Sequence, residues 1–182
     1  MQARKTRSLT YNHPTEEEVH QIQESLSQYI PKKAITDLFE NKQLLVGRGR
    51  RNEVFLVSSA VWSLYQQIQP TRNPYFLGQF LGELTPTHFR PSLQMLPFLV
   101  RKGTDSVKVV VTETGEQRFL YGQSLTENHL AKKALDLKEN QRILIVNEQG
   151  GGLGFGQVKH ISTTGVTITN QQDLGWYLRR GR

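Results

Sequence analysis

The segment "NEQGGGLGFGQVKHIS" spans residues 147 to 162 and carries five glycines within seven positions. A dinucleotide-binding fingerprint needs G-x-G-x-x-G between a strand and a helix, and a P-loop needs G-x-x-x-x-G-K-[ST]. Neither spacing occurs, because the third glycine of the fingerprint falls on Phe155 or Gln157. The following "QVKHIS" is typical of a strand, so the loop is not expected to lead into a helix whose N-terminus could bind a phosphate. The glycines instead predict tight turns and a bulged strand that another backbone approaches closely.

Two explanations of this glycine-lined hairpin remain open and are compatible. The glycines turn a corner of a β-barrel, or they also let the sugar-phosphate chain of a ligand lie against the main chain. The flanking sequence favours a barrel in either case. "VKVVV" (107–111), "RILIVN" (142–147) and "VTIT" (166–169) are apolar and β-branched, as expected of strands. Many short strands joined by tight turns predict a small closed β-barrel.

Local sequence patterns predict the secondary structure of the remaining C-terminal segments. "TETGEQ" (112–117) is expected to be a turn and "RFLYG" (118–122) a strand. "LTENHLAKKALDL" (125–137) is expected to be a helix capped by Thr126. "QQDLGWYLRR" (171–180) is expected to be a short closing helix with Asp173 as its cap.

The N-terminal half has a different pattern. Residues 1 to 13 are expected to form a flexible basic arm, and "PTEEEVHQIQESLSQYI" then predicts a helix opened by a Thr15–Glu18 capping box. "KQLLVGRGRRNEVFLVSS" predicts a β-hairpin and "SAVWSLYQQI" an amphipathic helix. The polar "RKGTDS" at 101–106 marks a domain boundary. The predicted organisation is an arm over 1–13, an α/β domain over 14–102 and a barrel over 103–182.

Composition restricts the function. The 182 residues include no cysteine, which excludes disulfides, thiolate metal sites and cysteine nucleophiles. No apolar run approaches the ~20 residues that span a bilayer, and no secretory signal is expected at the N-terminus. The five histidines form no H-E-x-x-H motif. The net charge of +7 is spread over both halves and favours a polyanionic partner.

The C-terminal motifs "FLYG", "LGFG" and "QQDLGWYLR" together resemble the PUA domain of the nuclear import protein seven family of ribosome-biogenesis factors. The N-terminal "LLV", "VFLVS", "LGQFLGELT" and "FRPSL" are similar in order to the pre-PUA domain of that family. The resemblance implies an α+β fold class, with an N-terminal α/β pre-PUA domain followed by a small PUA β-pseudobarrel.

The resemblance also implies the function. It implies a non-catalytic RNA-binding adaptor in large-subunit pre-rRNA processing, which binds rRNA or pre-rRNA through the PUA domain and ribosome-assembly proteins through the other domain. We expect no cofactor, no metal, no membrane contact and a monomer outside its complexes. The expected location is intracellular, in the nucleus and nucleolus of a eukaryote or the cytoplasm of an archaeon or bacterium. The alternatives are a protein-binding scaffold without RNA contact and an accessory part of an RNA-modifying enzyme.

RNA binding needs cations for phosphates and aromatic or polar groups for bases. The cations predicted to bind RNA in the C-terminal half are Lys132, Lys133, Lys159, His160, Arg179 and Arg180. Arg179 and Arg180 have an alternative role at a helix C-terminus. Tyr121 is a candidate for base stacking, and Gly154 and Gly156 for backbone approach, whereas Phe155 is expected in the core. Arg48, Arg50 and Arg51 lie at the predicted hairpin turn. They are either solvated surface charges of that turn or a secondary basic patch.

Overall fold

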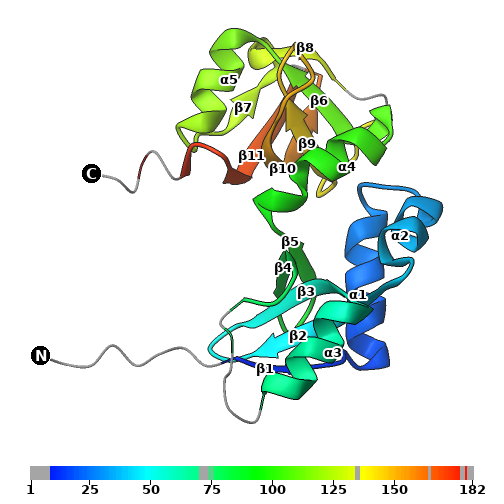
Figure 1. Ribbon diagram of the computed structural model, residues 1–182. Coiled ribbons are helices and arrows are strands. Elements are labelled where there is room, and N and C mark those ends of the chain that lie inside the picture. The colour runs from blue at the N-terminus through cyan, green and yellow to red at the C-terminus, as the bar shows by residue number, and fades with distance from the viewer. Residues whose placement is uncertain are drawn as a thin grey trace, which may run out of the picture. The chain divides into compact units, whose positions relative to one another are not determined.

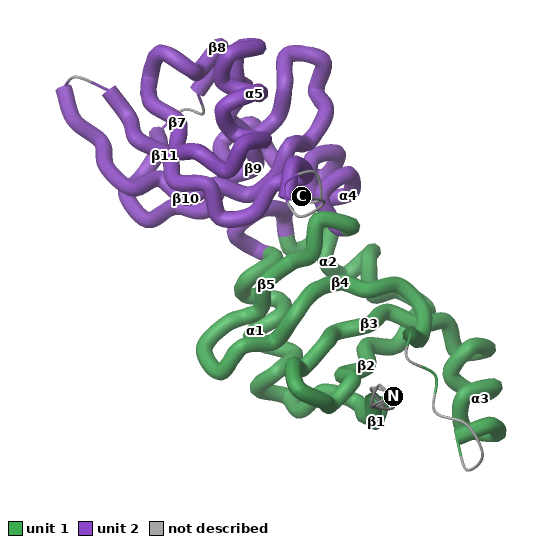
Figure 2. The backbone as a smooth tube through the Cα atoms, turned by 90° about the vertical axis from the view of Figure 1, so that its left-hand side faces the viewer, with its two compact units in different colours: residues 1–26, 32–94 green, residues 27–31, 95–182 purple. Residues whose placement is uncertain are grey.

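The computed structural model describes residues 9–69, 74, 76–133, 136–163, 165–176 and 179. The chain divides into two compact units, which Figure 2 shows in different colours. Unit 1 comprises Met1–Leu26 and Lys32–Gln94, and unit 2 comprises Ser27–Pro31 and Met95–Arg182. Each unit has its own sheet, so the expected pairing of an α/β domain with a second, β-rich domain is confirmed.

Unit 1 is a five-stranded antiparallel sheet with helices (Figure 1). Its strands follow the order of the chain: β1 (Thr10–Asn12), β2 (Lys42–Arg48), β3 (Asn52–Ser58), β4 (Gln79–Leu84) and β5 (Phe89–Pro91). Its helices are α1 (Glu16–Ser27), α2 (Lys32–Phe39) and α3 (Ser59–Ile68), and a 3-10 turn, η1 (Leu93–Met95), follows the last strand. The predicted β2–β3 hairpin and the predicted helix over "SAVWSLYQQI" are confirmed.

Helix α1 begins at the predicted capping box. The Glu18 amide donates to Thr15 Oγ1 at 3.2 Å, and the Thr15 amide donates to Glu18 Oε2 at 2.9 Å. These two bonds satisfy amides that a helix start leaves without an intrahelical partner. Ile22 and Leu26 are fully buried on the apolar face.

The described part of the expected N-terminal arm belongs to the sheet. Thr10 pairs with Arg48 of β2, and the Leu9 and Tyr11 side chains are buried. The Tyr11 ring packs edge-on against Phe55, with 5.5 Å between centroids. The expectation of a flexible arm is therefore wrong for residues 9 to 12, while residues 1 to 8 lie outside the described residues. A three-residue strand is too short to show its alternation in the sequence.

Unit 2 is a six-stranded, nearly closed sheet with strand order β7-β11-β10-β9-β6-β8. Its strands are β6 (Lys108–Val111), β7 (Leu125–Thr126), β8 (Leu130–Lys132), β9 (Arg142–Val146), β10 (Gly152–Ser162) and β11 (Gly165–Asp173). β6 and β9 are parallel and the other pairs are antiparallel. Its helical elements are α4 (Leu96–Lys102), α5 (Glu113–Leu120) and the 3-10 turns η2 (Asp105–Val107) and η3 (Glu127–His129). The predicted β-pseudobarrel is confirmed.

The core of unit 2 is apolar and is contributed by the strands and α5. Figure 1 shows the strands between α5 and α4. The fully buried members include Val109, Phe119, Leu125, Ile143, Ile145, Val158 and Ile168. The strand predicted from the continuous apolar run "RILIVN" is β9, in which Ile143 to Val146 are all buried.

Two local predictions in unit 2 are wrong. Residues 113 to 120, expected as a turn and a strand, form α5, whose N-cap Thr112 accepts a hydrogen bond from the Gly115 amide at 3.2 Å. Residues 125 to 132, expected as a helix, form β7, η3 and β8. The Thr126 cap opens only a single 3-10 turn, because Leu125 is buried in the core and Leu130 returns to pair with Val111.

The units divide after residue 94 and not after residue 102, where the polar "RKGTDS" segment had placed the boundary. Helix α4 includes the first two residues of that segment, Arg101 and Lys102, and belongs to unit 2, where it packs on β9 and β10. Residues 27–31 also belong to unit 2, since the Tyr29 ring packs against Phe155 with 5.6 Å between centroids. The expected core position of Phe155 is confirmed by its 5% exposure.

Candidate nucleic-acid interface

The glycine-rich loop is a tight hairpin between β9 and β10. The Asn147 amide donates to Gly151 O at 2.9 Å, and the Gly150 amide donates to Asn147 O at 2.9 Å. The Gly151 amide donates to the Asn147 side-chain oxygen at 2.7 Å. Gly150 has a φ of 81°, a conformation that glycine adopts at no steric cost. These amides are used within the loop, so they form no cradle for a phosphate.

Gly154 and Gly156 are buried in the strand that follows the loop. A Cβ on Gly154 would collide with the main chain of β11, at Gln172 O and Asp173 Cα. A Cβ on Gly156 would lie 2.8 Å from Ile168 Cγ2 and 3.1 Å from Ile145 Cδ1. Register shifts on either side confirm the predicted bulging. The glycines serve close packing between strands, and we do not retain them as RNA contacts.

The predicted lysines of β8 lie at an exposed edge of the sheet. Lys132 ends β8, where it pairs with Val110, and its side chain is exposed. Lys133 follows it, and its ammonium lies 2.9 Å from Glu127 Oε1. That hydrogen bond is the main cause that lowers the pKa of the Glu127 carboxyl. Glu127 Oε2 also accepts from the Val166 amide at 3.0 Å, which connects Lys133 to β11.

Lys159 and His160 lie on the exposed end of β10, where Lys159 occupies the second register shift and His160 follows it. His160 Nδ1 lies 3.0 Å from Glu139 Oε1, and the same oxygen accepts from the Ile161 amide at 3.1 Å. These two hydrogen bonds, that of Ile161 first, lower the pKa of the Glu139 carboxyl. Glu139 thus connects the 136–141 loop to this strand, and Lys138 of the same loop is exposed. Lys138 was not among the cations predicted from the sequence to bind RNA, although a lysine in a polar loop could have indicated it.

We group Lys132, Lys133, Lys138, Lys159 and His160 under the name hairpin surface, in which hydrogen bonds and strand pairing connect Lys133 to His160. Lys133 bonds Glu127, Glu127 bonds Val166, Val166 pairs with Ile161, and Ile161 bonds Glu139. Figure 2 shows the β10–β11 hairpin projecting from unit 2. Within the described part of the chain, Lys132, Lys138 and Lys159 form no ion pair.

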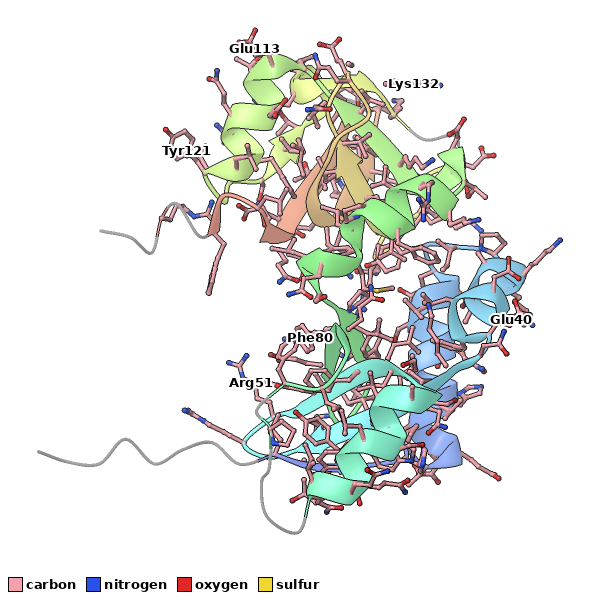
Figure 3. All side chains as sticks on the ribbon, in the orientation of Figure 1. Glu40, Arg51, Phe80, Glu113, Tyr121 and Lys132 are labelled. Atoms are coloured by element: carbon pink, nitrogen blue, oxygen red, sulfur yellow. The ribbon has the colours of Figure 1, made fainter. Side chains whose placement is uncertain are left out.

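Tyr121 and Arg179 lie apart from the hairpin surface. Figure 3 shows Tyr121 and Lys132 on different sides of unit 2. Arg179 forms a two-point ion pair with Asp173, at 2.9 Å and 2.8 Å, and also donates to Leu120 O. The Asp173 hydrogen bond is the main cause that raises the pKa of the Arg179 guanidinium.

Arg179 is therefore a structural residue, because it neutralises Asp173, which is only 2% exposed. Asp173, which was expected to cap a closing helix, ends β11; most of that helix lies outside the described residues. Arg180 lies outside the described residues.

The secondary basic patch is largely neutralised in unit 1. Arg48 contacts Glu18 through two hydrogen bonds, at 2.5 Å and 2.7 Å. That interaction is the main cause that lowers the pKa of the Glu18 carboxyl. Arg51 lies 2.8 Å from Glu83. Among the described residues Arg50 forms no ion pair, so it is the member of this patch whose charge is not offset.

Metal ligation has no visible basis in the described residues. They contain no group of three or more His, Cys, Asp or Glu side chains placed to hold an ion. Nor does any helix in the described ranges have the length and apolar character needed to cross a membrane.

A nearly closed sheet with an inserted helix, which follows a separate α/β unit in the chain, is the architecture of a PUA-domain protein. Residues 107–182 match the family described as UPF0113 PUA domain, and residues 11–93 match the family described as NIP7/UPF0113, pre-PUA domain. The chain belongs to the NIP7/UPF0113 family, which confirms the resemblance seen in its C-terminal motifs.

Relatives in the family come from eukaryotes and archaea. The chain is 30% identical over 174 residues to the 60S ribosome subunit biogenesis protein NIP7 of Saccharomyces cerevisiae, covering 91% of this chain and 94% of the yeast protein. It is 31% identical over 144 residues to a UPF0113 protein of Aeropyrum pernix, covering 78% of this chain and 77% of that protein. The names of the NIP7 relatives describe assembly factors and not enzymes.

Solved structures share the fold. A hypothetical protein from Pyrococcus horikoshii superposes with a TM-score of 0.59 at 15% identity, covering 93% of this chain and 99% of that chain. A conserved PUA domain protein from Thermoplasma acidophilum gives a TM-score of 0.56 at 15% identity, covering 94% of this chain and 99% of that chain. These similarities support the pre-PUA and PUA architecture.

Proposed function

We propose that this protein is a non-catalytic, RNA-binding factor in the assembly of the large ribosomal subunit. The names of its relatives support the ribosome-assembly role. The observation that carries RNA binding is the hairpin surface, where three exposed lysines have no carboxylate partner among the described residues. In this proposal unit 2 binds rRNA or pre-rRNA, and unit 1 binds assembly proteins.

The electrostatics of the hairpin surface suit a phosphate backbone. Each phosphate that a lysine neutralises releases condensed counterions, so affinity falls as salt rises. Lys133 pairs with Glu127, whereas Glu139 accepts hydrogen bonds from the Ile161 amide and from His160. Lys132, Lys138 and Lys159 have no carboxylate partner among the described residues, which leaves their charges available to a polyanion.

The test is a pair of charge-reversal variants with equal change in net charge. Lys132→Glu with Lys159→Glu removes two proposed phosphate contacts, and Lys32→Glu with Lys33→Glu makes the same change on exposed positions of α2. We expect the first variant to lose at least about tenfold in affinity for an rRNA fragment, measured by fluorescence anisotropy, and to show a shallower dependence on salt. Equal losses in both folded variants would show only a non-specific effect of net charge and would refute the assigned surface.

A protein-docking role for unit 1 has its own structural support. Helix α3 buries Tyr65 but leaves Leu64 57% exposed and Val61 37% exposed, and Phe76 is 49% exposed. Apolar side chains of this size on a surface are typical of contacts with another protein. We expect Leu64→Glu to reduce the proteins that copurify with the chain while RNA affinity stays unchanged. If no RNA binds the wild-type chain and copurification depends on Leu64, the protein is a scaffold alone.

The compartment follows from the proposed role. In a eukaryote it places the protein in the nucleus and nucleolus, and in an archaeon or bacterium in the cytoplasm. We propose that the chain is a monomer outside its complexes and acts without a cofactor. Colocalisation with a nucleolar marker in a eukaryotic host would test the first of these assignments.

A further inference from the structure

The β10–β11 hairpin extends beyond the strands that flank it in the sheet (Figure 2). On one side β9 begins at Arg142, which pairs with Gln157 of β10. On the other side β7 pairs only with Thr167 and Ile168 of β11. Near the tip of the hairpin, outward-facing main-chain amides therefore have no flanking strand to pair with among the described residues.

Two of these amides belong to Ile161 and Val166, which lie opposite each other in the hairpin. The Ile161 amide donates to Glu139 Oε1 at 3.1 Å, and the Val166 amide donates to Glu127 Oε2 at 3.0 Å. Because both amides donate to groups outside the hairpin, they point away from each other, as at the non-hydrogen-bonded positions of an antiparallel pair. The two carboxylates therefore cover opposite edges of the hairpin.

Each carboxylate also contacts a cation or histidine of the hairpin surface. Lys133 Nζ lies 2.9 Å from Glu127 Oε1, and His160 Nδ1 lies 3.0 Å from Glu139 Oε1. An ionised carboxylate only accepts hydrogen bonds, so His160 Nδ1 is the donor. The Lys133 bond is the main cause that lowers the pKa of Glu127, and the Ile161 amide is the main cause that lowers the pKa of Glu139. Both carboxyl groups are therefore ionised at neutral pH.

The donors that hold these carboxylates also suit phosphate. A main-chain amide beside a lysine or histidine donates to phosphate oxygens as it does to carboxylate oxygens. Each set of donors is followed or preceded in the chain by an exposed lysine, Lys132 beside Lys133 and Lys159 beside His160. Neither Lys132 nor Lys159 has a carboxylate partner within the described ranges. A phosphate chain could therefore use the same donors and a further cation.

Replacing the carboxylates requires only that their side chains move. The side chains of Glu127 and Glu139 are 38% and 51% exposed, so solvent reaches both. The loop that carries Glu139 has its own main-chain anchors. The Asn140 amide donates to Val158 O at 2.8 Å, and the Val158 amide donates to Gln141 O at 2.9 Å. These bonds hold the loop on β10 when the Glu139 carboxylate leaves the Ile161 amide.

We propose that Glu127 and Glu139 autoinhibit the hairpin surface, because in the free protein they occupy two phosphate sites from which bound RNA displaces them. One site consists of the Val166 amide and Lys133, and the other of the Ile161 amide and His160. This inference rests on the proposed RNA-binding function and adds how the same surface is regulated. Each carboxylate competes with RNA for its amide and its side-chain donor, so each lowers the affinity for RNA.

The test removes the two charges and keeps the hydrogen-bond acceptors. In Glu127→Gln with Glu139→Gln, a side-chain oxygen remains that can accept from each amide, so the edges of the hairpin stay covered. We expect the affinity of the full chain for an rRNA fragment to rise by about fivefold, measured by fluorescence anisotropy at about 0.15 M salt. The matched control is Glu113→Gln with Glu148→Gln, which makes the same change in net charge at exposed positions of unit 2. Its affinity should change by less than about twofold, because salt screens charges that RNA does not contact.

A second measurement on the wild-type chain follows the displacement itself. We expect the amide NMR signals of Ile161 and Val166 to shift when the rRNA fragment binds, because each amide exchanges a carboxylate for a phosphate. An equal gain in affinity in the two variants, or a loss in the Glu127→Gln, Glu139→Gln variant, would overturn the inference while RNA binding itself stands. Unmoved signals of both amides in the RNA-bound wild type would also overturn it. Absence of RNA binding by the wild type would instead refute the proposed function and the inference with it.

Discussion

Replacing Arg48 tests whether this predicted RNA contact is in fact a structural residue. The guanidinium makes hydrogen bonds of 2.5 Å and 2.7 Å to Glu18, joining the end of β2 to the first turn of α1. The side chains of Arg48 and Glu18 are 34% and 18% exposed. Glu18 also closes the capping box of α1, so the same carboxylate supports two elements of unit 1.

The magnitude follows from this partial burial. Hydrogen bonds to charged groups contribute about 1.5–3 kcal/mol when shielded from water, whereas exposed ion pairs contribute about 0.2–1 kcal/mol. After discounting for solvent screening, we expect Arg48→Ala to destabilise unit 1 by roughly 1.5 kcal/mol. For a slope of about 1.5 kcal/mol per molar urea, the unfolding midpoint should fall by about 1 M.

The assay follows Trp62 fluorescence during urea unfolding, in a Trp176→Phe background so that the signal reports unit 1. The control is Arg50→Ala in the same hairpin, whose charge is not paired among the described residues. We expect its stability to change by less than about 0.5 kcal/mol. Equal destabilisation by the two variants, or none by Arg48→Ala, would refute the structural role of Arg48.

Three other predictions concern pH and packing. Because Arg48 lowers the pKa of Glu18, the pair stabilises the fold above the ordinary Glu pKa and loses this effect as pH falls through the lowered value. The difference in the free energy of unfolding between wild type and Arg48→Ala should therefore be smaller in acid than at neutral pH, as measured by urea unfolding at both. Burial raises the pKa of Tyr29 to about 12, with Arg142 offsetting part of the effect. The neutral phenol therefore favours the folded state below pH 10, and this stability is lost as pH rises from about 10 to 12, by roughly 2 kcal/mol relative to Tyr29→Phe in alkaline unfolding followed by circular dichroism. Gly154→Ala should destabilise unit 2 by about 3 kcal/mol, because its Cβ meets the backbone of β11, whereas Gly150→Ala, where only the positive φ opposes a side chain, should cost about 1 kcal/mol in thermal unfolding.

The sequence predicted those elements whose signal is local. The α1 capping box is complete within four residues, and the apolar run of β9 is buried on both faces, so neighbouring residues alone decide these structures. Helix α5 was mispredicted because "RFLYG" has the apolar density of a strand. In the structure Phe119 faces the core and Tyr121 faces solvent, and Thr112 begins the helix several residues earlier.

The candidate site was only partly predictable for a related reason. The sequence identified Lys132 and Lys159 by charge, and both are exposed. It did not show that Lys133 and His160 are engaged by Glu127 and Glu139, because the β10–β11 hairpin and the 136–141 loop bring these partners from distant positions. Nor did it show that Gly154 faces the β11 main chain. Long-range pairing decides which charges remain available.

We propose that unit 2, and not unit 1, binds the RNA. The most direct measurement is photo-crosslinking of the full chain to an rRNA fragment containing 4-thiouridine, followed by mapping of the crosslinked peptides by mass spectrometry. We expect crosslinks in peptides that carry Lys132, Lys138 and Lys159, and their loss in Lys132→Glu with Lys159→Glu but not in Lys32→Glu with Lys33→Glu. Crosslinks confined to unit 1, or none in any part of the chain under conditions where a control RNA-binding protein reacts, would contradict the claim.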